Sequence, residues 1–211
     1  YPSLRNWYRQ TLALLPGHRM PLTAAFIAFL GALFVGYFLA QHYPFPPALQ
    51  ARLSEIDQVQ NISRIAGVAG RLPLLIFTHN LRVIVLASLL GVFTFGVAGL
   101  GVYMLPWTLI AYMAAQLAAA GESPWQFLLA TIAPHATVEL PALLLVAAAA
   151  LRWQSSLIAP THGRTISESW LTAAADFSRL FVGVAAPLLL LAALIEALVT
   201  PQVVVAVFGG G

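Results

Sequence analysis

Residues 22–40 read LTAAFIAFLGALFVGYFLA, an uncharged apolar run that decides the fold class of the chain. A helix needs about 20 apolar residues to cross the hydrocarbon core of a bilayer, which is close to the length of this run. The run lacks the alternation of apolar and polar residues that marks a strand of a membrane barrel. We therefore predict that residues 22–40 form the first membrane-spanning helix.

The composition of the whole chain extends this prediction beyond the first span. The 211 residues are 60% hydrophobic and only 8% charged, whereas a soluble globular domain has roughly 25% charged residues. Most of the surface must therefore face lipid, where every backbone polar group has to be paired within the chain. We predict an all-α, polytopic transmembrane helical bundle of about five spans, forming a single membrane domain over residues 1–211 and placed in the cell membrane.

Composition and motifs also exclude several classes of function. The chain has no cysteine, so disulfide bonds and thiolate chemistry are absent. The ten basic residues are all arginines and are scattered along the chain, so nucleic acid is not an expected partner. No serine elbow, P-loop, dinucleotide fingerprint or zinc-protease helix is found. We expect no cofactor and no soluble-enzyme chemistry, and the absence of a cleavage-site pattern predicts no removable signal peptide.

Two segments outside the spans are predicted to lie at the membrane surface. Residues 1–21 combine arginines with Trp7 and Tyr8, which is typical of a short interfacial helix leading into the first span. Residues 48–70 carry apolar side chains at intervals of three or four, which predicts an amphipathic helix. Such a helix either rests on the membrane or docks a partner.

Four further apolar segments complete the predicted bundle. The third span of the bundle is short and ends at a Gly-Glu-Ser-Pro turn. The fourth span contains Pro134 and Pro141, which remove backbone donors and predict a broken helix. An alternative is that the third and fourth segments are partly re-entrant. A polar connection is expected before the last span. The predicted spans are 80–105, 106–120, 125–151 and 176–199.

The distribution of arginines predicts the orientation in the membrane. Cytoplasmic segments of membrane proteins are enriched in basic residues. A cytoplasmic N-terminus with five spans places more arginines inside than outside, and the C-terminus then lies outside. The inside set is Arg5, Arg9, Arg19, Arg152, Arg164 and Arg179, and the outside set is Arg52, Arg64, Arg71 and Arg82.

Small residues in the second and third spans predict close packing between helices. Glycine and alanine let neighbouring helix backbones approach each other in a membrane. More small-residue surface is available than five helices need among themselves, so a homodimer is expected. The candidate packing residues are Gly91, Gly96, Gly99, Ala111, Ala114, Ala115 and Ala118.

His135 and Glu139 form a titratable pair inside the otherwise apolar fourth segment. Four residues apart on a helix, the two side chains share one face and can touch. Groups of this kind are expensive in a bilayer core and usually pair or face a cavity. The pair is consistent with a packing hydrogen bond, a proton or ion path, or the base and orienting group of an intramembrane hydrolase. We predict no metal site, because two ligands are too few and a third would have to come from a residue such as His79.

Three more polar residues extend this set. Asn80 and Arg82 lie where the second span enters the membrane, and Glu196 lies near the outer end of the last span. A buried Glu196 needs a partner, and Arg82 is a candidate. For Arg82 alone, extension of the side chain to the membrane interface is the simpler interpretation.

Three segments resemble the stage II sporulation protein M family. Residues 78–105 are similar to its Asn-containing helix entry, residues 133–142 to its Pro-His-Gly-x-x-Glu-x-Pro-Ala signature, and residues 191–201 to its closing Ala-x-x-Glu-x-x-x-Thr-Pro. The resemblance covers a family core of residues 71–201. The chain departs from the pattern at Ala136, where the family usually has glycine, and it lacks the Asn-Gly pair expected at the start of the third helix.

The resemblance implies a non-enzymatic membrane scaffold or assembly component of a cell-envelope complex. In spore formers the family is implied to act in engulfment together with peptidoglycan-degrading proteins, so cell-envelope or peptidoglycan-remodelling proteins are the expected partners. One alternative is a channel or transporter built around Asn80, His135, Glu139 and Glu196. Intramembrane hydrolysis is a third hypothesis.

Overall fold

The computed structural model describes residues 3–45 and 70–208. Over these residues every regular element is a helix, and five helical segments are long and apolar enough to cross a membrane. This confirms the predicted all-α bundle of about five spans. The predicted amphipathic helix at 48–70 falls almost entirely outside the described residues and stays a prediction.

Several spans are built from more than one helical piece. A 3-10 turn joins the first two helices, and π-helical turns join α7 to α8 and α9 to α10. The elements are α1 (Leu4–Leu12), α2 (Arg19–His42), α5 (Leu72–Phe93), α6 (Val97–Ala119), α7 (Pro124–Phe127), α8 (Ala133–Ser155), α9 (Ile166–Leu180), α10 (Ala186–Leu198) and α11 (Thr200–Phe208). The span candidates are Leu4–His42, Leu72–Phe93, Val97–Ala119, Pro124–Ser155 and Ile166–Phe208.

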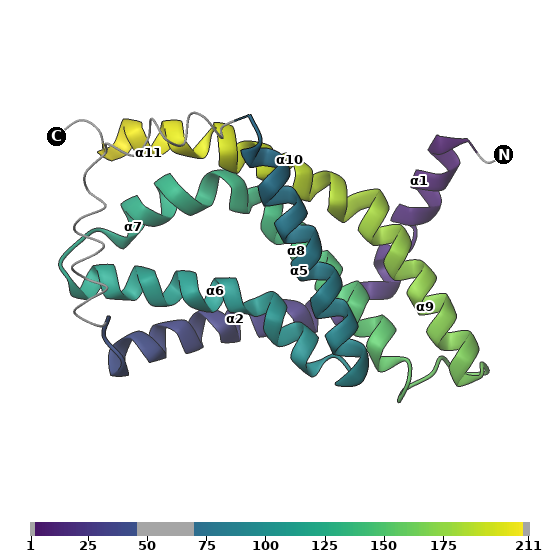
Figure 1. Cartoon of the computed structure of the whole chain (residues 1–211). Coiled ribbons are helices and arrows are strands. Elements are labelled where there is room, and N and C mark those ends of the chain that lie inside the picture. The colour runs from purple at the N-terminus through teal and green to yellow at the C-terminus, as the bar shows by residue number, and fades with distance from the viewer. Residues whose placement is uncertain (1–2, 46–69, 209–211) are drawn as a thin grey trace.

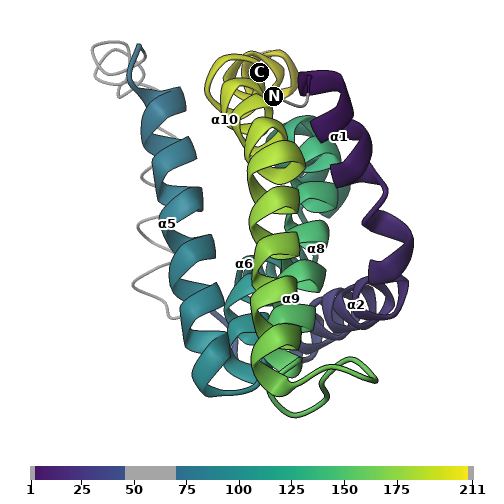
Figure 2. The same ribbon diagram turned by 90° about the vertical axis from the view of Figure 1, so that its right-hand side faces the viewer.

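Helix α8 is at the centre of the bundle. It contacts α2, α5, α6, α9 and α10, and Figure 2 shows α5 and α2 on opposite sides of α8, α9 and α10. In Figure 1, α2, α6 and α7 run along the long dimension, and α1 and α11 lie at its opposite ends. Residues 147–150 of α8 are four consecutive buried alanines, so helices can pack closely on every side of it.

The predicted boundary between the second and third spans is wrong. Helix α5 ends at Phe93 and α6 begins at Val97, whereas Pro106 lies inside α6. The chain reverses at Gly96, whose φ of 99° is accessible to glycine without steric penalty. A proline inside a membrane helix removes one backbone hydrogen bond, and neighbouring helices compensate for this loss.

The fourth span is interrupted at one of its two prolines. A π-helical turn over Leu128–Ile132 precedes Pro134, which is in the first turn of α8. Helix α8 then continues through Pro141 to Ser155. The predicted break at Pro141 is therefore wrong, and the apolar helix Pro124–Ser155 is long enough to cross the membrane as one bent span.

The polar connection before the last span is shorter than predicted. Helix α9 begins at Ile166, well before residue 176, and a capping box at its start explains why. The Thr165 hydroxyl accepts a hydrogen bond from the Glu168 backbone N–H, and the Glu168 carboxylate accepts one from the Thr165 backbone N–H. The Thr-x-x-Glu pattern is typical of the start of a helix. Hydropathy alone does not detect this pattern.

Candidate functional site

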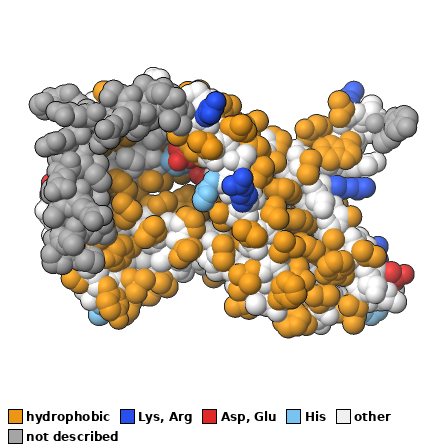
Figure 3. Space-filling model, in the orientation of Figure 1, with side chains coloured by type: hydrophobic (Ala, Val, Ile, Leu, Met, Phe, Trp, Pro, Cys, Tyr) orange, Lys and Arg blue, Asp and Glu red, His pale blue; other side chains and the backbone are white. Residues whose placement is uncertain are grey.

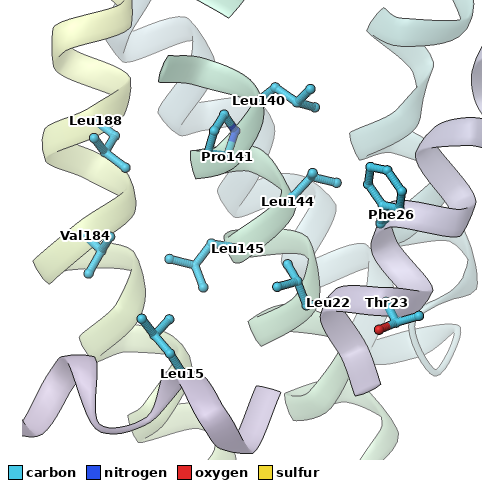
Figure 4. A pocket seen from close by; sticks show the side chains of 10 residues that line it. All are labelled: Leu15, Leu22, Thr23, Phe26, Leu140, Pro141, Leu144, Leu145, Val184 and Leu188. Carbon is cyan, nitrogen blue, oxygen red and sulfur yellow. The ribbon is translucent and has the colours of Figure 1, made fainter. Parts of the chain in front are cut away.

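One cavity of the bundle is almost entirely apolar, and the hydroxyl of its single polar lining residue, Thr23, already donates to the Arg19 carbonyl. It measures about 620 Å³ and is lined by side chains of the first, fourth and fifth spans. In Figure 4 these are aliphatic or aromatic apart from Thr23, and they include Pro141. Specific ligand sites combine an apolar wall with a few convergent polar groups. The polar side chains elsewhere in the bundle are therefore better candidates for a functional site.

Four of the predicted site residues meet in one polar cluster. His135 and Glu139 lie one turn apart on α8, and α10 packs against both α5 and α8. This packing brings Asn80 of α5 and Glu196 of α10 to the same place. Thr200, the first residue of α11, completes the group. We call His135, Glu139, Glu196, Asn80 and Thr200 the polar cluster.

Hydrogen bonds hold two of these side chains in position. Asn80 Nδ2 donates to Glu139 Oε1 at 3.3 Å, and the other oxygen, Oε2, lies 3.8 Å from His135 Nε2. His135 Nδ1 lies 3.4 Å from the Thr200 hydroxyl oxygen. The histidine is thus in contact with Thr200 on one side and faces a carboxylate on the other.

Glu196 contributes a second carboxylate to the cluster. One ligand atom each from His135, Glu139 and Glu196 lie within 4.8 Å of one another. The predicted contact with Arg82 is not formed: within residues 3–45 and 70–208, Arg82 is exposed and makes no ion pair with Glu196. The exposed position agrees with the simpler interpretation that this arginine extends to the interface.

The cluster is largely shielded but borders a small cavity that has several polar side chains in its wall. The side chains of His135 and Glu139 are 11% and 17% exposed. A cavity of about 80 Å³ beside Glu139 is also lined by His79, Asn80 and Tyr103. Figure 3 shows acidic and histidine side chains at a hollow in an otherwise mostly apolar face. Such a volume holds a few water molecules, so a proton or a small cation could reach the cluster.

The two predicted signature prolines lie in different surroundings. Pro134 adjoins His135 in the first turn of α8, directly after the π-helical turn, where its missing N–H removes one backbone hydrogen bond from the continuous span. Pro141 is exposed and lines the apolar cavity of Figure 4. Pro134 therefore lies next to the polar cluster, at the start of the helix that carries His135 and Glu139. Pro141 borders the apolar cavity instead.

The predicted packing residues differ in how closely they are surrounded. A Cβ at Gly91 would collide with the Gln154 side chain, and one at Gly99 would lie 2.7 Å from the Ala87 carbonyl oxygen. A Cβ at Gly96 would lie 2.5 Å from Leu151 Cδ1. Among the alanines, Ala111 lies against Gly36 of α2, Ala114 and Ala115 are half-buried, and Ala118 is exposed.

Sequence reasoning missed several polar contacts between helices. Gln154 Nε2 donates to the Ser88 carbonyl at 2.8 Å, and Arg152 lies 3.7 Å from Asp176. Thr200 belongs to the closing Thr-Pro motif of the chain but was not predicted as a site residue. Buried polar residues in membrane helices face protein, and this rule could have identified Gln154 and Asp176 as packing contacts.

Comparison with known proteins identifies a family. The family model described as Stage II sporulation protein M matches residues 25–201. No curated protein and no solved structure matches the chain. The matched region contains every member of the polar cluster.

Proposed function

Because the chain belongs to the stage II sporulation protein M family, we propose that this multi-pass membrane protein is a scaffold of a cell-envelope complex in the cell membrane. Peptidoglycan-remodelling proteins and a second copy of the chain are the proposed partners. The observation that carries the proposal is the close backbone packing of the spans, which suits a fixed platform better than a moving gate. The cavity beside Glu139, which borders the polar cluster, is small at about 80 Å³.

The closest packing joins the first, second and third spans. A Cβ at Gly36 of α2 would collide with the Thr108 carbonyl oxygen of α6, and Gly99 of α6 lies against Gly91 of α5. Contacts between backbones cannot be relieved by side-chain rotation. Relative sliding of these spans would therefore break many contacts at once, which supports a static role.

Helix α1 is the described surface best placed to engage a partner. Its Trp7 packs against Gly183 of the last span, which fixes the helix on the bundle. Leu4, Tyr8 and Leu12 lie four residues apart and are 78%, 44% and 50% exposed. An apolar stripe at this spacing suits the groove of a partner helix or the lipid interface.

Crosslinking in native membranes tests the scaffold proposal. We expect the wild type to recover specific cell-envelope proteins, identified by mass spectrometry, together with a crosslinked dimer. The triple variant L4A/Y8A/L12A should recover these envelope proteins less efficiently. The matched control is I27A/L30A/F34A, which truncates three exposed apolar residues of α2 and should leave recovery unchanged. Absence of any specific partner of the wild type would contradict the proposal.

We propose that the scaffold is not an enzyme. A hydrolase of the triad type would need a nucleophile, a base and an orienting acid in a continuous hydrogen-bonded chain. The Thr200 hydroxyl donates to the Ile195 carbonyl, and the separation of 3.8 Å between His135 and Glu139 is too long for a hydrogen bond. These distances argue against a Thr-His-Glu triad.

The polar cluster favours proton permeation as a second candidate function. Two carboxylates and an imidazole lie within 4.8 Å inside membrane-spanning helices, and such groups often form proton relays. The cavity beside Glu139 would supply water to one side of the relay.

A liposome assay separates this candidate from a purely structural role. If the relay operates, vesicles that contain the purified protein and a pH-sensitive dye should acidify after the external pH is lowered, and Glu139→Gln should abolish this flux because an amide cannot carry the proton. Glu122→Gln, at an exposed turn, is the control and should conduct like the wild type. Circular dichroism would establish that both variants remain folded. An inert wild type would rule the candidate out.

A further inference from the structure

Three side chains of the polar cluster offer metal-binding atoms from two helices. The atoms are an imidazole nitrogen of His135, a carboxylate oxygen of Glu139 and a carboxylate oxygen of Glu196, all within 4.8 Å of one another. In sequence, Glu196 is remote from the other two. The packing of α10 on α8 therefore supplies the third ligand that the sequence alone does not identify.

The hydrogen bonds around His135 direct a free nitrogen lone pair toward Glu139. The Thr200 hydroxyl donates to the Ile195 carbonyl, so its oxygen is left to accept from His135 Nδ1–H. Nε2 is then unprotonated and faces Glu139 Oε2 at 3.8 Å. Two acceptor atoms that face each other require a cation or a proton between them.

The position of Glu196 adds to this requirement. Within the described residues, Glu196 forms no hydrogen bond and no ion pair, although it lies close to the Glu139 carboxylate. The single described partner that donates to Glu139 is the neutral amide of Asn80, at 3.3 Å. Two neighbouring carboxylates in a membrane-spanning region are stabilised strongly by a divalent cation.

We propose that His135, Glu139 and Glu196 bind one divalent transition-metal ion, best represented by Zn²⁺. Imidazole favours zinc and neighbouring transition metals over Mg²⁺ and Ca²⁺, and carboxylate oxygens are regular zinc ligands. Ligands of a tetrahedral zinc ion lie roughly 3.3 Å apart at bond lengths of about 2.0 Å. Small side-chain rotations bring the three atoms from their observed spacing to that distance.

The surrounding residues match the supporting role seen at metal sites. Thr200 holds the histidine through Nδ1, and Asn80 holds Glu139 through Oε1. Partners of this kind fix the tautomer and the orientation of metal ligands. The cavity beside Glu139 can provide a water molecule as fourth ligand. The ion would tie α8 to α10, and this role does not depend on the proposed scaffold function.

Metal binding to the full-length protein in detergent tests the site. Equilibrium dialysis against Zn²⁺, followed by elemental analysis, should give about one ion per chain. Glu196→Gln and His135→Gln should abolish this binding, and Asn80→Ala should weaken it roughly 10–100-fold. Glu122→Gln and His162→Gln, at exposed positions, should bind like the wild type. Mg²⁺ binding as tight as Zn²⁺ would exclude the imidazole as a ligand and overturn the site.

A second pair of measurements tests the site mainly on the wild type, so that it remains testable if a variant fails to fold. Co²⁺ added to the wild type should produce the visible absorption bands of a mixed nitrogen and oxygen ligand set, and Zn²⁺ should displace them. Zn²⁺ should also raise the melting temperature of the wild type, but not that of folded Glu196→Gln. Absence of bound Zn²⁺ and of the cobalt bands in the wild type would show that a proton, not a metal, lies between the acceptors.

Discussion

Substitution of Gly36 by alanine is expected to loosen the contact between the first and third spans and to destabilise the whole bundle. A Cβ at this position would collide with the Thr108 carbonyl oxygen of α6 and lie 2.9 Å from Ala111 Cβ. Neither atom can rotate away, so the two helices must separate. Overpacking of this kind costs about 1–3 kcal/mol.

Gly31 is the matched control because it lies on the same helix and a Cβ added there would meet no atom within 4 Å. Both substitutions raise intrinsic helix propensity by the same amount, about 1 kcal/mol. The difference between them therefore isolates the steric clash. We expect thermal unfolding in detergent, followed by circular dichroism, to show a lower melting temperature for Gly36→Ala than for Gly31→Ala. Equal melting temperatures would show that α2 and α6 do not pack as described.

The spans were predictable because lipid imposes a strong requirement on composition and length. An uncharged run such as residues 22–40 has few alternatives to a membrane helix. The ends of the helices were less predictable because they depend on local geometry. The chain reverses at Gly96, which adopts a positive φ. From sequence alone, Pro106 is the stronger signal for the end of a helix, and yet it lies within α6.

The candidate site was predictable only where its members are close in sequence. Helical spacing placed His135 beside Glu139, and the two lie 3.8 Å apart. The position of Glu196 depends on how α10 packs against α8, which no local pattern specifies. Arg82 was the wrong candidate partner for Glu196. The prediction used only their opposite charges and their similar predicted depth in the membrane, and neither determines which face of α5 points toward α10.

Substitution of Arg152 by methionine is expected to destabilise the bundle at the C-terminal end of α8, away from the polar cluster. Its guanidinium Nη1 lies 3.7 Å from Asp176 Oδ2 and 3.4 Å from His18 Nδ1. The Asp176 side chain is 12% exposed, so loss of the arginine leaves a shielded carboxylate without its ion-pair partner. Removing one member of a fully buried pair costs roughly 3–5 kcal/mol. Arg152 is 34% exposed, so the expected loss is at or below the lower end of that range.

A double-mutant cycle distinguishes this effect from general loss of packing. If the unpaired carboxylate causes the destabilisation, Arg152→Met combined with Asp176→Leu should be more stable than Arg152→Met alone, because the second change removes the stranded charge. Arg164→Met is the control, since Arg164 is exposed and donates to the Thr172 hydroxyl. Chemical unfolding in detergent would measure the stabilities of Arg152→Met, Asp176→Leu, the double variant and Arg164→Met. If Arg164→Met loses as much stability as Arg152→Met, the ion pair between Arg152 and Asp176 adds no stability beyond that of an exposed arginine. Recovery in the double variant would instead show that this ion pair contributes to the contact between the fourth and fifth spans.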